Sequence, residues 1–260
     1  MLDEIQIRIH GQASQPTLIY LPGMHGDWTL VSSLRSEVQG EVRFVEVTYP
    51  RTTSWSLHHY AAGVSDALAV NQIRHGWVLA ESFSSQVAWA ILEEAEQNGF
   101  RMEGLILAGG FVRHPFMPAV HLARAVNRNI PMWLLKAFCW VYARYAKLRH
   151  HRAPETLACI SDFVKNRINE ADRLAICHRY TLIAGSDLQA IARKARLPVF
   201  QLCGFFDPIV PWPFVHPWLK RNCPGLRGWK IVLGADHNVL GTAPRVSAAC
   251  ILGWMRSREL

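Results

Sequence analysis

The sequence predicts an α/β fold: a mostly parallel sheet with helices on both faces and a helical insertion between two strands. Short apolar segments alternate with helical patterns up to residue 111 and again from residue 187. Strands that are apolar throughout are typical of parallel sheets, whose two faces are both buried. Half of the 260 residues are hydrophobic, enough for a large core, and 18% are charged, which excludes a disordered chain.

Seven segments have the pattern of strands. The first, residues 4–11, alternates apolar and polar residues, as an exposed or edge strand does. The others are short apolar runs that end near turn-forming or small residues, as buried strands do. They span 16–23, 41–50, 76–81, 103–110, 197–204 and 228–234.

Helical spacing of apolar residues appears between these strands and after the last one. Asp27 is the predicted N-cap of the first helix, and Gly99 the predicted end of the third. The expected helices span 25–38, 54–73, 84–99, 213–222 and 241–257.

The alternation stops over residues 112–186, which are mostly helical in pattern, basic and rich in aromatic residues. We expect residues 1–111 and 187–260 to form one core, with 112–186 as the insertion. Between Arg113 and Arg179 there are twelve Lys or Arg and four Asp or Glu, a balance that equals the net charge of +8. A solvated face is the simplest explanation; an acidic ligand or a membrane surface also fits, and no nucleic-acid motif accompanies the charge.

Neither a leader nor a metal site is expected. The first residues, MLDEIQIRIHGQ, lack the basic start and apolar stretch of a signal peptide, and no apolar run reaches the length of a membrane span. The six cysteines are scattered without CxxC spacing. We therefore expect reduced thiols, a cytoplasmic location, and neither a metal nor a cofactor.

A cluster of small residues, AESFS, joins the strand at 76–81 to the helix at 84–99. A nucleophile on a sharp strand-to-helix turn needs small residues two positions to either side, which is the reason for the G-x-S-x-G pattern. Here Ala80 and Ser84 flank Ser82, so the pattern is relaxed. A serine that caps the helix is the alternative.

Two further polar residues follow late strands. Asp207 lies after the strand at 197–204, and His237 after the strand at 228–234. An ordinary turn aspartate and a loop histidine are the alternatives. Asp236 is adjacent to His237, but neighbouring side chains usually point apart, so Asp207 is the preferred partner. Gly23 would let the loop after the second strand approach a ligand, so that the N–H groups of Met24 and Phe83 would donate to an oxyanion.

The order Ser82, Asp207, His237, each at a strand end, is the order of the catalytic triad in α/β-hydrolases. The chain resembles that superfamily in LPGMHGD, LAESFSSQVA, GFFDPIVP and ADHNVLG, which span residues 21–241 and leave the insertion unmatched. The resemblance implies a serine that attacks an acyl carbon, a histidine that transfers the proton, and an acid that holds the histidine. It also implies that the insertion is a cap.

The expected function is therefore hydrolysis of a carboxylic ester or thioester with an apolar acyl group. An acyltransferase with the same acyl-enzyme and a non-catalytic binding protein are the alternatives. His25, Trp28 and Phe206 are candidates for the substrate pocket. Residues 130–148 are apolar nearly all round, which suits a packed cap helix, a wall for an acyl chain, or peripheral contact with lipid. The basic loop 147–155 would suit an anionic group or a solvated position.

Overall fold

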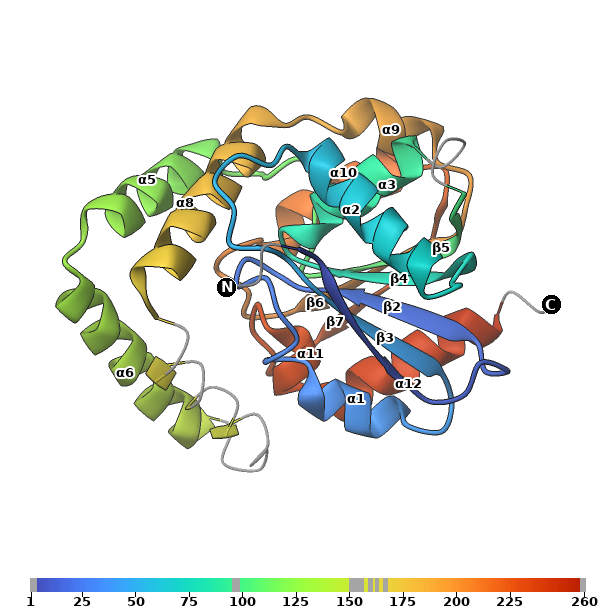
Figure 1. Ribbon diagram of the computed structural model, residues 1–260, viewed down its shortest axis with the longest axis horizontal. Helices are drawn as coiled ribbons and strands as arrows, with labels where there is room; N and C mark the ends of the chain where they lie inside the picture. The colour runs from blue at the N-terminus through green and yellow to red at the C-terminus, as the bar shows by residue number, and fades with distance from the viewer. Residues whose placement is uncertain are drawn as a thin grey trace.

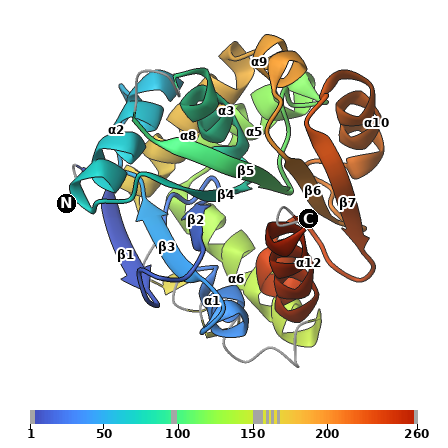
Figure 2. The same ribbon diagram turned by 90° about the vertical axis from the view of Figure 1, so that its right-hand side faces the viewer.

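Seven strands form one sheet in the computed structural model, which describes residues 4–94, 99–149, 157–158, 161, 164–165 and 168–257. The strand order is β1-β3-β2-β4-β5-β6-β7 (Figure 2). β1 pairs antiparallel with β3, and every other pair is parallel, which confirms the predicted mostly parallel sheet with an edge strand at the start. The strands are β1 (Gln6–His10), β2 (Thr17–Leu21), β3 (Arg43–Thr48), β4 (His75–Glu81), β5 (Arg101–Ala108), β6 (Val199–Gly204) and β7 (Leu226–Val232).

Helices cover both faces of this sheet (Figure 1). One face carries α2 (Leu57–Val70), α3 (Ser84–Glu93), α9 (Gln189–Lys194) and α10 (Trp212–Asn222), and the other carries α1 (Ser32–Val38), α11 (Val239–Thr242) and α12 (Pro244–Arg256). Two buried cores result. Along β4, Val78 and Ala80 belong to the first core and Trp77 and Leu79 to the second, because successive strand side chains point to opposite faces.

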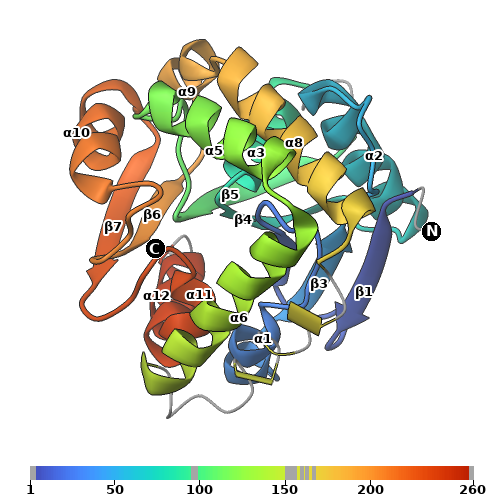
Figure 3. The ribbon, with the colours of Figure 1, turned by 90° about the vertical axis from the view of Figure 1, so that its left-hand side faces the viewer.

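Helices α5 (Met117–Asn129), α6 (Met132–Arg149) and α8 (Glu170–Gly185) come between β5 and α9 in the chain. They stand together at one end of the molecule (Figures 1 and 3), and α5 packs beside α8. Residues 147–149 of the expected loop at 147–155 belong to α6, and residues 150–155 lie outside the described residues. Within the described parts of the chain, no helix combines the length and apolarity that a transmembrane span requires.

The first helix begins later than the sequence pattern predicts. Residues 22–31 form a loop, in which the Asp27 Oδ1 accepts the Thr29 N–H at 2.9 Å. Asp27 therefore stabilises a turn of the loop and does not cap the helix, which starts at Ser32. The predicted helix after β4 is found as α3, and residues 95–98 of that prediction lie outside the described residues.

The contact between Trp77 and Gly104 generates a stability prediction. These residues are paired across β4 and β5, and a Cβ on Gly104 would lie 2.3 Å from the Trp77 ring. We expect Gly104→Ala to lower the free energy of unfolding by about 2 kcal/mol, because the ring must shift. Gly253→Ala is the control: it lies on the exposed side of α12 with no atom within 4 Å, and should raise stability by about 1 kcal/mol. Urea denaturation measures both, and equal midpoints would contradict the packing.

Candidate active site

Ser82 occupies the turn between β4 and α3 with a φ of 50°. This left-handed conformation costs a non-glycine residue about 1–2 kcal/mol. Neighbouring hydrogen bonds hold it: the Ser82 N–H donates to the Ala108 carbonyl at 3.0 Å, and the Ser82 carbonyl accepts from the Ser85 N–H at 2.9 Å. Strained backbone of this kind gathers at functional sites.

The two small residues that flank this turn are fully buried. Ala80 and Ser84 both have no exposed surface. The Ser84 hydroxyl donates to the Pro22 carbonyl and shares a hydrogen bond of 2.6 Å with the Tyr49 hydroxyl. A serine is therefore tolerated where the pattern usually has glycine, because its polar atom has partners.

The structure brings together the three residues selected from the sequence. The His237 Nε2 lies 2.8 Å from the Ser82 Oγ, and the His237 Nδ1 lies 2.8 Å from the Asp207 Oδ2. The other carboxylate oxygen of Asp207 accepts the N–H groups of Ile209 and Val210 at 2.9 Å each. Ser82 thus contacts the imidazole, and α3 begins with no side-chain cap.

Asp236, adjacent to the histidine, has a different contact. Its Oδ1 accepts the Asn238 N–H at 3.1 Å. Asp207 is the acid in contact with the imidazole, as the preference for a non-adjacent partner predicts.

Space for the imidazole is provided by Gly109, directly after β5. Its φ is 56°, and a Cβ at this position would lie 3.2 Å from the His237 Nδ1. A larger residue would be strained by its backbone and would press on the ring. Three strand ends, those of β4, β5 and β6, therefore form the surroundings of His237, together with the loop after β7.

The charge of Asp207 governs the protonation of the histidine. Burial lowers the pKa of His237, but the hydrogen bond and the negative charge of Asp207 outweigh it, with further contributions from Glu81 and Asp236. The net effect raises the pKa of His237 above its ordinary value. A carboxylate in direct contact stabilises the imidazolium form, which is the protonation state a general base acquires.

A cavity of about 160 Å³ adjoins Ser82, with mostly apolar walls. Met24 and His25 line it, as do residues of α5 and α8. The lining residues are Gly23, Met24, His25, Leu30, Glu81, Ser82, Phe111, His114, Val120, Tyr180, Ile183, Ile209, Val210, His237 and Asn238. No described residue of α6 is among them, so the expected acyl wall at 130–148 does not come from that helix.

The other two pocket candidates lie elsewhere. Trp28 packs against the second core, with the Arg8 guanidinium 3.8 Å from its ring centroid. Phe206 is 57% exposed and packs edge-on against Phe205. A sequence places these residues in loops at strand ends but does not specify which way their side chains turn.

The two predicted oxyanion donors belong to the loop after β2 and to the start of α3. Met24 lies in the cavity wall, and Phe83 follows Ser82 as the N-cap residue of α3. The first donors to the α3 turn are Ser85 and Gln86, so the Phe83 N–H is not used by the helix.

Two titratable residues of the site were missed by sequence reasoning. Glu81 is 5% exposed; its Oε2 accepts the Tyr20 hydroxyl and the Gly23 N–H, the latter at 3.3 Å. An acidic residue at the end of an apolar strand, directly before the serine, is a signal that could have revealed it. His114 is 7% exposed and its pKa is lowered, chiefly by burial, which favours the neutral ring. Nothing in its sequence context separates it from the other histidines.

Arg179 of α8 was also missed, and it fastens this helix to the loop that carries Met24. Its side chain is 2% exposed. Its Nη1 donates to the Met24 carbonyl at 2.7 Å and its Nη2 to the Pro50 carbonyl at 3.2 Å, while the guanidinium faces the rings of Tyr49, Tyr60 and Phe83. Gly26 leaves room for it, since a Cβ there would lie 2.5 Å from Nη1.

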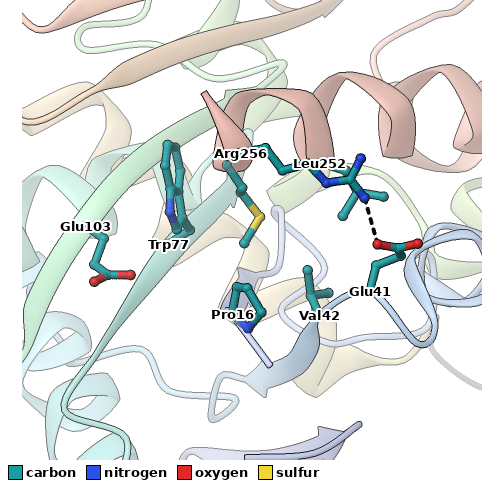
Figure 4. A pocket seen from close by; sticks show the side chains of 8 residues that line it. Pro16, Glu41, Val42, Trp77, Glu103, Leu252 and Arg256 are labelled. Atoms are coloured by element: carbon teal, nitrogen blue, oxygen red, sulfur yellow. Dashed lines mark hydrogen bonds and ion pairs between the residues drawn. The ribbon is translucent and has the colours of Figure 1, made fainter. Parts of the chain in front are cut away.

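A larger cavity, of about 390 Å³, lies at the opposite ends of the strands (Figure 4). Trp77 and Glu103 reach it from the beginnings of β4 and β5, and Arg256 bonds to Glu41 at 2.7 Å on its rim. Ligands of open parallel sheets bind beyond the carboxyl ends of the strands, which is where Ser82 lies. Among the residues the structure describes, no three His, Cys, Asp or Glu side chains form a group that could hold a metal ion.

The chain matches no protein-family model and no curated protein sequence. Solved structures do resemble it. The enol-lactonase from Burkholderia xenovorans LB400 is 16% identical, with a TM-score of 0.76 over 97% of this chain and 96% of that one. An esterase from Thermogutta terrifontis is 19% identical, with a TM-score of 0.74 over 97% of this chain and 93% of that one. An α/β-hydrolase from a deep-sea metagenome library is 11% identical, with a TM-score of 0.78 over 96% of this chain and 94% of that one. These likenesses show that the chain has the α/β-hydrolase fold, as predicted.

The Arg179 contact generates a prediction about the reactivity of Ser82. We expect Arg179→Met to lower the free energy of unfolding by about 3 kcal/mol, because the carbonyls of Met24 and Pro50 lose a charged donor. The loop beside Ser82 should then loosen, and labelling of Ser82 by a fluorophosphonate should slow about tenfold.

Arg173→Met is the matched control on the same helix. Arg173 donates to the Ile130 carbonyl at 3.0 Å, away from the Met24 loop. The Arg173→Met variant should have a lower free energy of unfolding, but its Ser82 should be labelled by the fluorophosphonate as fast as in wild type. If both variants slow labelling equally, the packing of α8 matters and its contact with Met24 does not.

Proposed function

We propose that this protein, an α/β-hydrolase by fold, is a serine hydrolase that cleaves a carboxylic ester or thioester with an apolar acyl group. The observation that carries the proposal is the hydrogen-bonded series Ser82–His237–Asp207 beside an apolar cavity. The esterase and the enol-lactonase among the structures of the same fold are consistent with it.

In the proposed mechanism the Ser82 Oγ attacks the acyl carbon while His237 Nε2 takes its proton. A serine hydroxyl is a poor nucleophile until a base removes that proton. Asp207, fixed by two backbone N–H groups, stabilises the imidazolium. The N–H groups of Met24 and Phe83 stabilise the oxyanion, and loss of one such donor typically costs about 3 kcal/mol.

Collapse of the tetrahedral intermediate breaks the bond to the leaving alcohol or thiol, which receives the proton from His237. An acyl-enzyme on Ser82 remains. Water then attacks its carbonyl, His237 takes the proton of the water, and the second collapse returns that proton to Ser82 and releases the carboxylic acid.

The small size of the cavity favours a small substrate with a short apolar acyl group. At about 160 Å³ it is smaller than the cavities that hold drug-sized ligands. Phe111, Val120 and Ile183 supply apolar wall, and Glu81 places a carboxylate in it, which disfavours an acyl group that itself bears a negative charge. Since Val120 and Ile183 belong to α5 and α8, we assign these helices to a cap.

Substitution of Ser82 tests the proposal directly. Wild-type protein should hydrolyse p-nitrophenyl esters of short acids with a burst of p-nitrophenol, and Ser82→Ala should lose the burst and about a thousandfold of the rate. Ser56→Ala is the matched control, because Ser56 is a true helix cap whose Oγ accepts the His59 N–H at 3.2 Å. It should lower stability by about 1 kcal/mol and keep the activity. Equal activity of Ser82→Ala and wild type would refute the nucleophile assignment.

The raised pKa of His237 predicts the pH profile. The base must be neutral, so kcat/KM should rise with pH through the pKa of His237 and level off above it, with the midpoint above 6.5. Glu81 contributes to that raised pKa, so Glu81→Gln should move the rising limb to lower pH. Glu103→Gln, at the far end of β5, should leave it in place. If kcat/KM rises at the same pH in Glu81→Gln as in wild type, Glu81 does not contribute to the raised pKa of His237.

A further inference from the structure

Helix α6 has no buried side chain among those described. Residues 132–145 and Lys147 are all partly or largely exposed, although the helix is rich in large apolar residues. In Figure 3 it lies across the end of the molecule. A helix of 18 residues with this much uncovered apolar surface is uncommon on a monomer, and marks a site where something else binds.

The exposed residues of α6 form two stripes on different sides of the helix. Phe138, Val141, Tyr142 and Tyr145 follow the spacing i, i+3, i+4, i+7, so they share one face, and each is between 49% and 59% exposed. Trp133, Lys136, Trp140, Arg144 and Lys147 form a second stripe, centred about 150° around the helix axis from the first. Trp133 is 71% exposed, and the Arg144 guanidinium stacks 4.0 Å from the Trp140 ring centroid.

Charge narrows the choice of partner. Between residues 104 and 154 the sequence has eight Lys or Arg and no Asp or Glu. A second copy of the chain would bring two such segments together, and their like charges would repel. A negatively charged partner is favoured instead.

The composition of the two stripes points to a lipid surface. Tryptophan and tyrosine settle at the level of lipid headgroups, while lysine and arginine extend from an apolar helix to anionic headgroups. An aliphatic residue such as Val141 among the aromatic rings suits acyl chains and offers no stacking surface to nucleic-acid bases.

We propose that α6 lies in the surface of a membrane that contains anionic lipid, and holds the protein there as a peripheral protein. Phe138 and Val141 enter the apolar boundary, and Lys136, Arg144 and Lys147 meet lipid phosphates. This proposal does not depend on the reaction at Ser82, because no described α6 residue lines the cavity beside it.

The experiment is co-sedimentation of the Ser82→Ala protein with vesicles of phosphatidylcholine, with and without phosphatidylglycerol. We expect binding to the anionic vesicles that weakens as salt is added, and little binding to the neutral ones. Phe138→Ser with Val141→Ser, and separately the triple change Lys136→Glu, Arg144→Glu, Lys147→Glu, should each reduce binding at least about tenfold.

Matched controls use exposed residues of other elements. Val70→Ser with Leu233→Ser removes two apolar side chains that are 82% and 79% exposed. Lys220→Glu, Arg221→Glu and Lys230→Glu reverse three exposed charges on α10 and β7. The apolar control should bind as the parent does, and the charge control should bind more strongly than the α6 triple. Circular dichroism checks that each variant is folded.

Three outcomes would overturn the proposal. The first is no binding to anionic vesicles at low salt. The second is an equal loss in the α6 triple and in its charge control, which would make the binding a property of net charge. The third is that Phe138→Ser with Val141→Ser binds vesicles normally but abolishes self-association or binding to a single-stranded oligonucleotide, which would assign the face to another copy or to nucleic acid.

Discussion

The left-handed backbone at Ser82 is the constraint around which the neighbouring structure is arranged. A chain that turns this sharply from strand to helix requires small residues on either side, and Ala80 and Ser84 are both without exposed surface. Hydrogen bonds from other residues must also stabilise this turn. The Ser85 hydroxyl donates to the Ser82 carbonyl at 2.6 Å and accepts the Phe111 N–H at 3.0 Å. The turn is thus tied to the loop after β5, and the Ser82 hydroxyl is held at the rim of the sheet.

The carboxylates around this turn act together on the imidazole of His237. His237 is in contact with Asp207, and Glu81 and Asp236 add to the negative potential that it experiences. Tyr20 and Gly23 provide donors to Glu81, so a carboxylate can be buried directly beside the proposed nucleophile. The loop with Met24 is held from both sides, by Glu81 through Gly23 and by Arg179 through the Met24 carbonyl.

Sequence reasoning succeeded where a parallel sheet determines the outcome. Ser82, Asp207 and His237 follow different strands, and strands that run the same way bring their carboxyl ends to one edge. It did less well where packing between distant segments decides. Arg179 belongs to a basic segment and nothing in its neighbourhood marks it as buried. Trp28 and Phe206 occupy loops at strand ends, but Trp28 packs against the second core and Phe206 against Phe205. The start of α1 was misplaced because Asp27 closes a turn by the same hydrogen bond that would cap a helix.

The contacts of the Arg179 guanidinium affect whether the segment between β5 and β6 could be replaced by another one. Insertions between β5 and β6 look interchangeable when only the chain order is considered, since both junctions lie outside the sheet. In this protein, however, α8 supplies a cation to carbonyls at Met24 and Pro50, and Gly26 makes the space for it. A segment from another protein without a basic residue at this position would leave the carbonyls of Met24 and Pro50 without their charged donor, and would leave a gap beside Gly26. A replacement segment would therefore be expected to need a basic residue at the position of Arg179 and a glycine opposite it at the position of Gly26.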